Sequence, residues 1–300
     1  MVRVTMTRTR RQRDIRIAYL LLAPAVLLLL GVLAYPLGWE VWTSFTSLSP
    51  LQDGATAFVG LENYRRQFHD PQFWSAAAVT LVYTVVTSVA KLALGLGFAL
   101  LLARPFPGRT LVFLAIFLPW AYPASVSVIG WYWTLNPPIP TAYAAFMGSV
   151  KYNVDSVAGG GAWAFISVAL FNIWRGSSFI GVLLLAGINA IPPELFEYAL
   201  LESKSPWRRF RAVTLPLLAP FLALGVFLSL TGAFADLANV WTLTAGRIVF
   251  PVLSTQAYWL AIHGGQFGPA SALSLMLVPL LLGALLVLFR LFDGPEREPS

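Results

Sequence analysis

The chain has 300 residues, of which 58% are apolar and only 11% are charged, and its formal net charge is +7. Soluble proteins carry roughly a quarter of charged residues. A mean hydropathy of +0.72 therefore excludes an ordinary soluble globule and predicts a chain that is largely solvated by lipid. The absence of cysteine excludes a disulfide framework and a thiolate metal site, and two histidines far apart disfavour a histidine metal site.

Six stretches are long and apolar enough to cross a membrane as helices. About 20 apolar residues span the hydrocarbon layer, and lipid offers the backbone no hydrogen-bonding partner, so each span must be helical. In chain order the stretches are 17–38, 76–103, 110–135, 162–190, 212–244 and 270–292. A seventh apolar stretch, 250–262, is too short and predicts a re-entrant or surface helix. The predicted fold class is an all-α, polytopic membrane protein with six transmembrane helices.

The first apolar segment follows an arginine-rich tail, as the core of a secretory signal peptide does. A signal peptide has an apolar core of only about 7–15 residues. This stretch runs on into Trp39, Trp42 and Phe45, which predict an aromatic belt at the membrane interface. We therefore interpret 17–45 as a retained transmembrane helix.

Basic residues are concentrated on one side of the predicted spans. They lie in the N-terminal tail, after the second span at Arg104 and Arg109, after the fourth span over 204–211, and at the C-terminus. The positive-inside rule then predicts a multi-pass protein with both termini in the cytoplasm. The net charge is thus explained by membrane orientation, and no nucleic-acid partner is expected.

The motifs that carry common enzymatic chemistry are absent from the sequence. It contains no G-x-x-x-x-G-K-[ST] phosphate loop, no H-E-x-x-H and no G-x-S-x-G. We expect a non-catalytic protein with no cofactor or metal of its own. A transport subunit that uses the energy of a partner fits this pattern better than an enzyme.

The loop between the fourth and fifth spans predicts a rigid cytoplasmic elbow over 192–205. Pro192 and Pro193 suit the first turn of a helix, where a backbone N–H is dispensable. Glu194 and Glu197 then lie near the positive end of the helix dipole. Ser205 followed by Pro206 predicts the cap and first position of a second, basic helix over 207–214.

This elbow resembles the "EAA" signature of the permease subunits of ATP-binding-cassette (ABC) importers. Glu197 and Ala199 match its first and third positions, and Val213-Thr214-Leu215-Pro216 matches its I-x-L-P ending. Tyr198 replaces the first alanine, and Ser203 replaces the glycine that normally allows a bend. The coupling residues that the resemblance implies are Glu194, Glu197, Ala199, Glu202, Ser203, Arg208 and Phe210.

Further segments resemble the carbohydrate branch of these importers, and specifically the larger maltose-importer permease and the first glycerol-phosphate permease. They include Ala34-Tyr35-Pro36 and the stretches 58–64 and 266–274. The resemblance implies a type I importer permease fold and a location in the bacterial cytoplasmic (inner) membrane. It divides the chain into a basic tail (1–16), a first helix (17–45), an external loop (46–73), a permease core (74–292) with a coupling loop (190–211), and a cytoplasmic tail (293–300).

The resemblance also implies partners. They are a second, homologous and non-identical permease that forms a heterodimer with this chain, two ATPase subunits that bind ATP and magnesium, and an extracytoplasmic substrate-binding protein. ATP-driven closure of the ATPases would move the elbows and switch the pathway. An ion-coupled secondary transporter of a small polar solute is the alternative, but it would favour internal repeats and several buried acids.

Polar residues at membrane depth are the candidates for a substrate pathway, because a charge inside a span is costly. Arg175 and Asp236 stand out, together with Asn239. The two charged residues could contact a substrate, or could simply pair with each other or with the partner permease. Lys91 is interpreted as a snorkelling or subunit-facing lysine. Alignment with the maltose permease places the pathway on Asn172, Arg175, Gly176, Phe179, Ser229, Gly232, Ala233 and Asp236.

Overall fold

The computed structural model describes residues 8–51, 56–135 and 162–292. Within those ranges the chain is helical, and the one extended pairing is an isolated antiparallel bridge between Thr46 and Phe58. The elements are α1 (Arg8–Ser44), α2 (Glu62–His69), α3 (Pro71–Leu102), α4 (Arg109–Ala121), α5 (Ala124–Leu135), α8 (Ala162–Asn189), α9 (Pro193–Glu202), α10 (Pro206–Arg209), a π-helical turn (Phe210–Thr214), α11 (Leu215–Phe234), α12 (Leu237–Leu243), α13 (Leu253–Ile262) and α14 (Phe267–Phe292).

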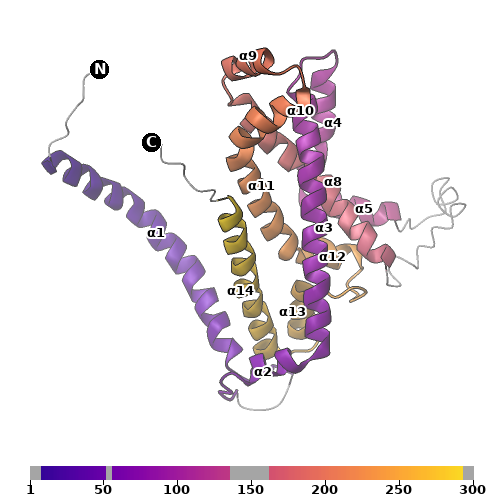
Figure 1. Cartoon of the computed structure of the whole chain (residues 1–300). Helices are drawn as coiled ribbons and strands as arrows, with labels where there is room; N and C mark the ends of the chain where they lie inside the picture. The colour runs from indigo at the N-terminus through magenta and orange to yellow at the C-terminus, as the bar shows by residue number, and fades with distance from the viewer. Residues whose placement is uncertain (1–7, 52–55, 136–161, 293–300) are drawn as a thin grey trace, which may run out of the picture.

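The predicted spans correspond to helices of the structure (Figure 1). Among the described residues, four helices are long and apolar enough to cross a membrane, and five when the bent pair α4 and α5 counts as one span. The sixth predicted span is α14, whose apolar stretch Phe267–Gly283 is shorter than the others. The all-α, polytopic fold class is confirmed.

Small residues bring α3 and α8 together at the centre of the bundle. A Cβ atom added to Gly95 of α3 would lie 2.6 Å from Cγ2 of Ile180 and 3.0 Å from the backbone nitrogen of Gly181 on α8. Farther along α8, a Cβ on Gly187 would lie 2.7 Å from Cδ1 of Leu218 on α11. Small residues of this kind allow close backbone approach between membrane helices, where burial of apolar surface gives no driving force.

Two of the predicted spans are broken. α4 and α5 meet at an angle of 95°, and Pro123 lies in the link between them. The prediction of one continuous span over 212–244 is wrong, because α11 ends at Phe234 and α12 begins at Leu237. The break lies at Ala235 and Asp236, and it turns a polar side chain into the bundle.

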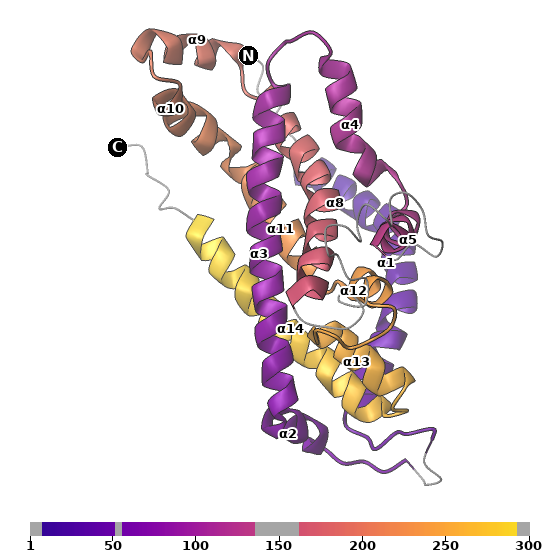
Figure 2. The same ribbon diagram turned by 90° about the vertical axis from the view of Figure 1, so that its right-hand side faces the viewer.

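The segment between the first two spans is more ordered than a simple external loop. It contains α2, which the sequence analysis did not predict. The Asn63 amide on this helix donates to the backbone carbonyls of Ser44 and Thr46, at 2.8 Å each. The end of α1 is therefore fixed to the bundle, whereas the rest of α1 leans away from it (Figure 1). In the view turned by 90°, α1 lies behind the other helices (Figure 2).

The boundaries at the two chain ends are only partly comparable with the predictions. α1 begins at Arg8, so the helix already includes the second half of the predicted tail 1–16. Residues 1–7 and the predicted tail 293–300 lie outside the described residues.

The short apolar stretch 250–262 contains α13, as predicted, but this helix is packed inside the bundle. Leu253 is buried, and its backbone N–H donates to Thr80 Oγ1 at 2.9 Å.

Candidate substrate pathway and coupling helix

A cavity of about 310 Å³ lies between α3, α8, α11 and α12. Six of the eight pathway residues predicted by alignment with the maltose permease line this cavity, although they come from distant parts of the chain. They are Asn172, Arg175, Gly176, Phe179, Ser229 and Gly232. Lys91, Trp120, Phe171, Ile180, Leu228 and Asn239 complete the lining. The other two predicted residues, Ala233 and Asp236, are buried behind this lining.

Several polar atoms at this cavity have no partner within the described chain. They are the Oδ1 atom of Asn172, the Nε atom of Arg175 and the Oγ atom of Ser229. A buried polar atom without a hydrogen bond is costly, and most such atoms in proteins are satisfied. A polar ligand in the cavity would supply the missing partners.

Asp236 lies in the break between α11 and α12, and its carboxylate accepts three hydrogen bonds. Its Oδ2 atom accepts from the Tyr83 hydroxyl and from the Asn172 amide, both at 2.7 Å. Its Oδ1 atom accepts from the Asn239 amide at 2.7 Å. The carboxylate therefore connects α3, α8 and α12, and it orients the two amides that face the cavity.

The suggested pairing of Arg175 with Asp236 is not found. One terminal nitrogen of Arg175 donates instead to the backbone carbonyl of Tyr122 at 3.3 Å. This carbonyl lies at the bend between α4 and α5, so Arg175 links the bend to α8. Beside it, the rings of Trp120 and Phe179 stack with centroids 5.3 Å apart and give the cavity an aromatic wall.

Lys91 does not snorkel, so the first half of its interpretation as a snorkelling or subunit-facing lysine is wrong, and the second half stays a prediction. Its side chain is only 5% exposed, and its ammonium group donates to the backbone carbonyl of Ser229 at 3.4 Å. The stem passes so close to Gly176 that a Cβ atom there would overlap it. The ammonium also attracts the Asp236 carboxylate electrostatically. Lys91 therefore belongs to the cavity, although its position in an apolar span gave no signal of this.

The elbow forms as the capping residues predict. α9 begins at Pro193, directly after Pro192, and Ser205 caps α10 by accepting from the backbone N–H of Arg208. Ser203, the residue in place of the family glycine, has φ −148° and ψ 130°. This extended conformation is open to any residue. The bend therefore does not require glycine here.

The outer face of the elbow is exposed at the end of the bundle (Figure 1). Tyr198 is 69% exposed and Leu201 is 87% exposed, and the three predicted coupling glutamates are exposed as well. Ala199 faces inward and is buried. The predicted Arg208 is exposed, whereas Phe210 is half-buried and stacks on Trp207 with ring centroids 5.6 Å apart. Neighbouring exposed apolar side chains of this kind are typical of a protein contact surface.

A helical membrane protein with a polar cavity in its bundle and a capped elbow at one end is of the permease class. The family described as "Binding-protein-dependent transport system inner membrane component" matches residues 92–293. The chain belongs to this family and is an inner-membrane component of an ABC transporter. Membership excludes the alternative of an ion-coupled secondary transporter.

Relatives of known role match over nearly the whole chain. The trehalose transport system permease protein SugA of Mycobacterium tuberculosis is 30% identical over 97% of this chain and 94% of its own length. The sulfoquinovosyl glycerol transport system permease protein SmoG of Agrobacterium fabrum is 32% identical over 93% of this chain and 91% of its own length. The trehalose/maltose permease MalF of Thermococcus litoralis is 28% identical over 94% of this chain and 95% of its own length.

Solved structures share the fold. A chain of a bacterial alginate ABC transporter, crystallised in complex with an alginate-bound periplasmic protein, superposes with a TM-score of 0.75 at 18% identity. That match covers 97% of this chain and 99% of the other. A second structure of an alginate importer gives a TM-score of 0.73 at 20% identity, over 96% of this chain and 100% of the other. The importer permease fold is therefore confirmed.

Proposed function

We propose that this permease carries a sugar or sugar derivative through the cavity between α3, α8, α11 and α12. The observation that carries the proposal is the set of unpartnered polar atoms on Asn172, Arg175 and Ser229 beside the stacked rings of Trp120 and Phe179. Amide and hydroxyl groups match the donors and acceptors of sugar hydroxyls, and an aromatic wall suits the apolar face of a sugar ring.

The names of the relatives support the same substrate class. SugA and MalF are named for trehalose or maltose, and SmoG for an anionic sulfonated sugar glycoside. Arg175 would favour an anionic derivative, whereas a neutral sugar would use Asn172 and Ser229. Asp236 serves in this proposal as a positioning residue, because it lies behind the lining and orients the amides of Asn172 and Asn239.

The assembly that we propose has two permeases, this chain and a homologous, non-identical partner. Two ATPase subunits bind ATP and magnesium, and an extracytoplasmic binding protein delivers the substrate. The elbow contacts one ATPase through Glu194, Glu197, Glu202 and the exposed part of α9, while the permease itself has no catalytic role. With the elbow in the cytoplasm, both chain termini are cytoplasmic, and the permease core over 74–292 forms one unit with its coupling loop at 190–211.

The test combines a ligand screen of the binding protein with a transport assay of the whole importer. The cognate binding protein of the importer is screened by thermal shift against trehalose, maltose, glucose and sulfoquinovosyl glycerol. Uptake of the panel is then measured in proteoliposomes that contain the whole importer. We expect ATP-dependent uptake of at least one sugar, and Asn172→Leu should reduce it without changing the affinity of the binding protein. ATP-dependent uptake of another solute class, with no sugar transported, would refute the proposal.

A further inference from the structure

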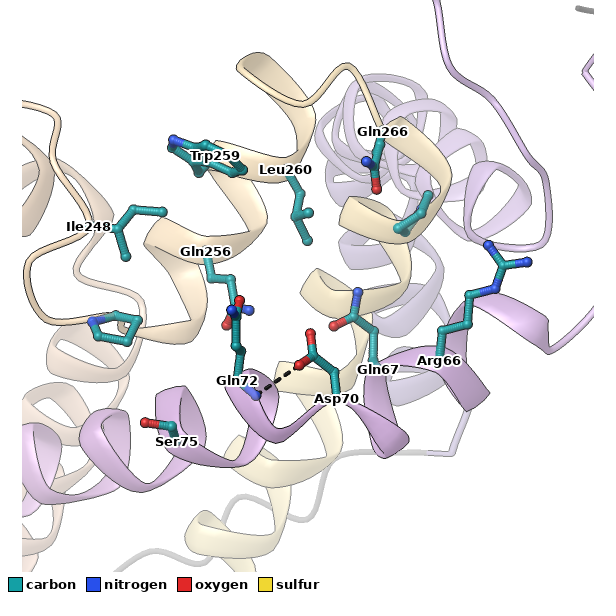
Figure 3. Close-up of a pocket in the computed structure, with 12 residues that line it drawn as sticks. Arg66, Gln67, Asp70, Gln72, Ser75, Ile248, Gln256, Trp259, Leu260 and Gln266 are labelled. Carbon is teal, nitrogen blue, oxygen red and sulfur yellow. Dashed lines mark hydrogen bonds between the residues drawn. The ribbon is translucent and has the colours of Figure 1, made fainter. Parts of the chain in front are cut away.

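A second polar pocket lies at the end of the bundle opposite the elbow, where α2 and the start of α3 meet α13 and α14 (Figures 1 and 3). Its volume is about 590 Å³, within the range of about 300–1,000 Å³ typical of small-molecule sites. The residues that line it are Arg66, Gln67, Asp70, Gln72, Ser75, Ile248, Pro251, Gln256, Trp259, Leu260, Gln266 and Pro269.

Two amides in this pocket lack a partner. The side chains of Gln67 on α2 and Gln256 on α13 are 7% and 8% exposed, and the Oε1 atom of each has no hydrogen bond. Both side chains are drawn at the pocket in Figure 3, on opposite sides of it. An unmatched buried acceptor on each of two helices at the same pocket requires an explanation, and a hydrogen-bond donor in the pocket provides one.

The charged groups at the pocket have opposite signs, and each makes one hydrogen bond within the chain. Asp70 Oδ1 accepts from the backbone N–H of Gln72 at 2.8 Å and so caps α3. Arg66 Nε donates to Glu62 at 3.0 Å in an exposed ion pair. One acid and one base, each with a partner, favour neither an anion nor a cation. The remaining polar groups are mostly amides, which both donate and accept as sugar hydroxyls do.

We propose that this pocket binds a neutral, polyhydroxylated ligand of the same sugar class as the central cavity, as a separate receiving site. The inference rests on the proposed function. Ser75 in this pocket and Lys91 in the central cavity are 16 residues apart on α3, which is about 24 Å along a helix. One small sugar cannot reach both. Trp259, which is 41% exposed, offers a partly apolar wall to the sugar ring.

The test measures sugar binding to the complete importer in nanodiscs, without its binding protein. The probe is the panel sugar that the wild-type importer takes up, observed by saturation-transfer difference NMR. Gln67→Leu and Gln256→Leu keep side chains of similar size but remove the amides. We expect each to raise the apparent Kd about fivefold or more, the effect of losing about one hydrogen bond. Asn172→Leu, in the central cavity, should leave this signal in place.

Thr84→Val is the matched control. Like Gln67 and Gln256, Thr84 has a buried side chain with an unpartnered oxygen, but it is on α3 and lies outside both sets of lining residues. It should leave the Kd unchanged. Because leucine removes an unmatched acceptor, the Gln→Leu variants should unfold at or above the wild-type temperature, so lost binding cannot be ascribed to misfolding.

The outcomes that would overturn the inference are distinct from those that would overturn the proposed function. Unchanged sugar binding in both Gln→Leu variants, with normal wild-type uptake, refutes the second site alone. A loss of affinity for the binding protein with unchanged sugar binding identifies the pocket as a protein contact and also refutes it. A wild-type importer that transports no sugar refutes the proposed function and the inference together.

Discussion

The Asp236 carboxylate offers the sharpest test of the central cavity. Asp236→Ala removes the common acceptor of the Tyr83 hydroxyl and of the amides of Asn172 and Asn239. These donors come from α3, α8 and α12, so the change releases three elements at once. The Lys91 ammonium also loses its nearby opposite charge. We expect lower stability and lower uptake together.

The expected magnitude follows from the number of hydrogen bonds lost. Hydrogen bonds between membrane helices contribute about 0.6 kcal/mol on average and at most about 1.7 kcal/mol, so the two bonds from α3 and α8 amount to about 1–3 kcal/mol, and the local bond from Asn239 adds to this. Asp236→Asn keeps one oxygen for Tyr83 and Asn172, and the Asn239 amide can turn to present its own oxygen. Its cost should therefore stay near that of a single bond, about 0.6–1.7 kcal/mol.

The assay heats the purified importer and follows the fraction that remains monodisperse, in parallel with uptake by proteoliposomes. The unfolding midpoint should fall in the order wild type, Asp236→Asn, Asp236→Ala. Asn239→Ala, which removes one donor only, should lie near Asp236→Asn. Binding-protein affinity should not change in any variant. A wild-type midpoint and wild-type uptake in Asp236→Ala would refute the positioning role.

Two further predictions concern the elbow and the helix packing. Glu197→Lys reverses a charge on the exposed face of α9, so ATP hydrolysis should lose its coupling to uptake while membrane insertion persists; normal transport would contradict the elbow assignment. Gly95→Val forces a Cβ to 2.6 Å from Ile180, and overpacking of this kind costs about 1–3 kcal/mol. Gly97→Val, whose Cβ has no atom within 4 Å, is the matched control that should leave the thermal midpoint unchanged.

The sequence predicted those parts of the fold that local chemistry determines. Length and hydropathy located the spans, because lipid imposes helical structure on any apolar stretch of that length. The elbow was predicted to within a residue or two at its caps, since Pro193, Ser205 and Pro206 act through the adjacent backbone. Ser203 in place of the family glycine does not disturb the elbow, because its backbone is extended and any residue can adopt that conformation.

The parts that depend on tertiary contacts were not predictable in the same way. The break after Phe234 occurs in a stretch whose hydropathy is continuous, and it is stabilised by donors on other helices. In the sequence, Lys91 is an unpaired charge in an apolar span, because its partners, the Ser229 carbonyl and the Asp236 charge, are distant along the chain. The helix α2 is anchored through Asn63 to the end of α1, again a contact that no local pattern encodes.

The break at Asp236 connects the cavity with the elbow through the chain itself. An aspartate before a helix normally caps that helix with its own carboxylate, yet Asp236 makes no such bond to the α12 backbone. Its oxygens accept from side chains of α3, α8 and α12 instead. α8 leads directly into α9, and α10 leads through the π-helical turn into α11. The two helices that present Asn172 and Ser229 to the cavity are therefore those joined by the elbow. We expect a displacement of the elbow to change the distance between these two side chains and, with it, the affinity of the cavity for a bound substrate.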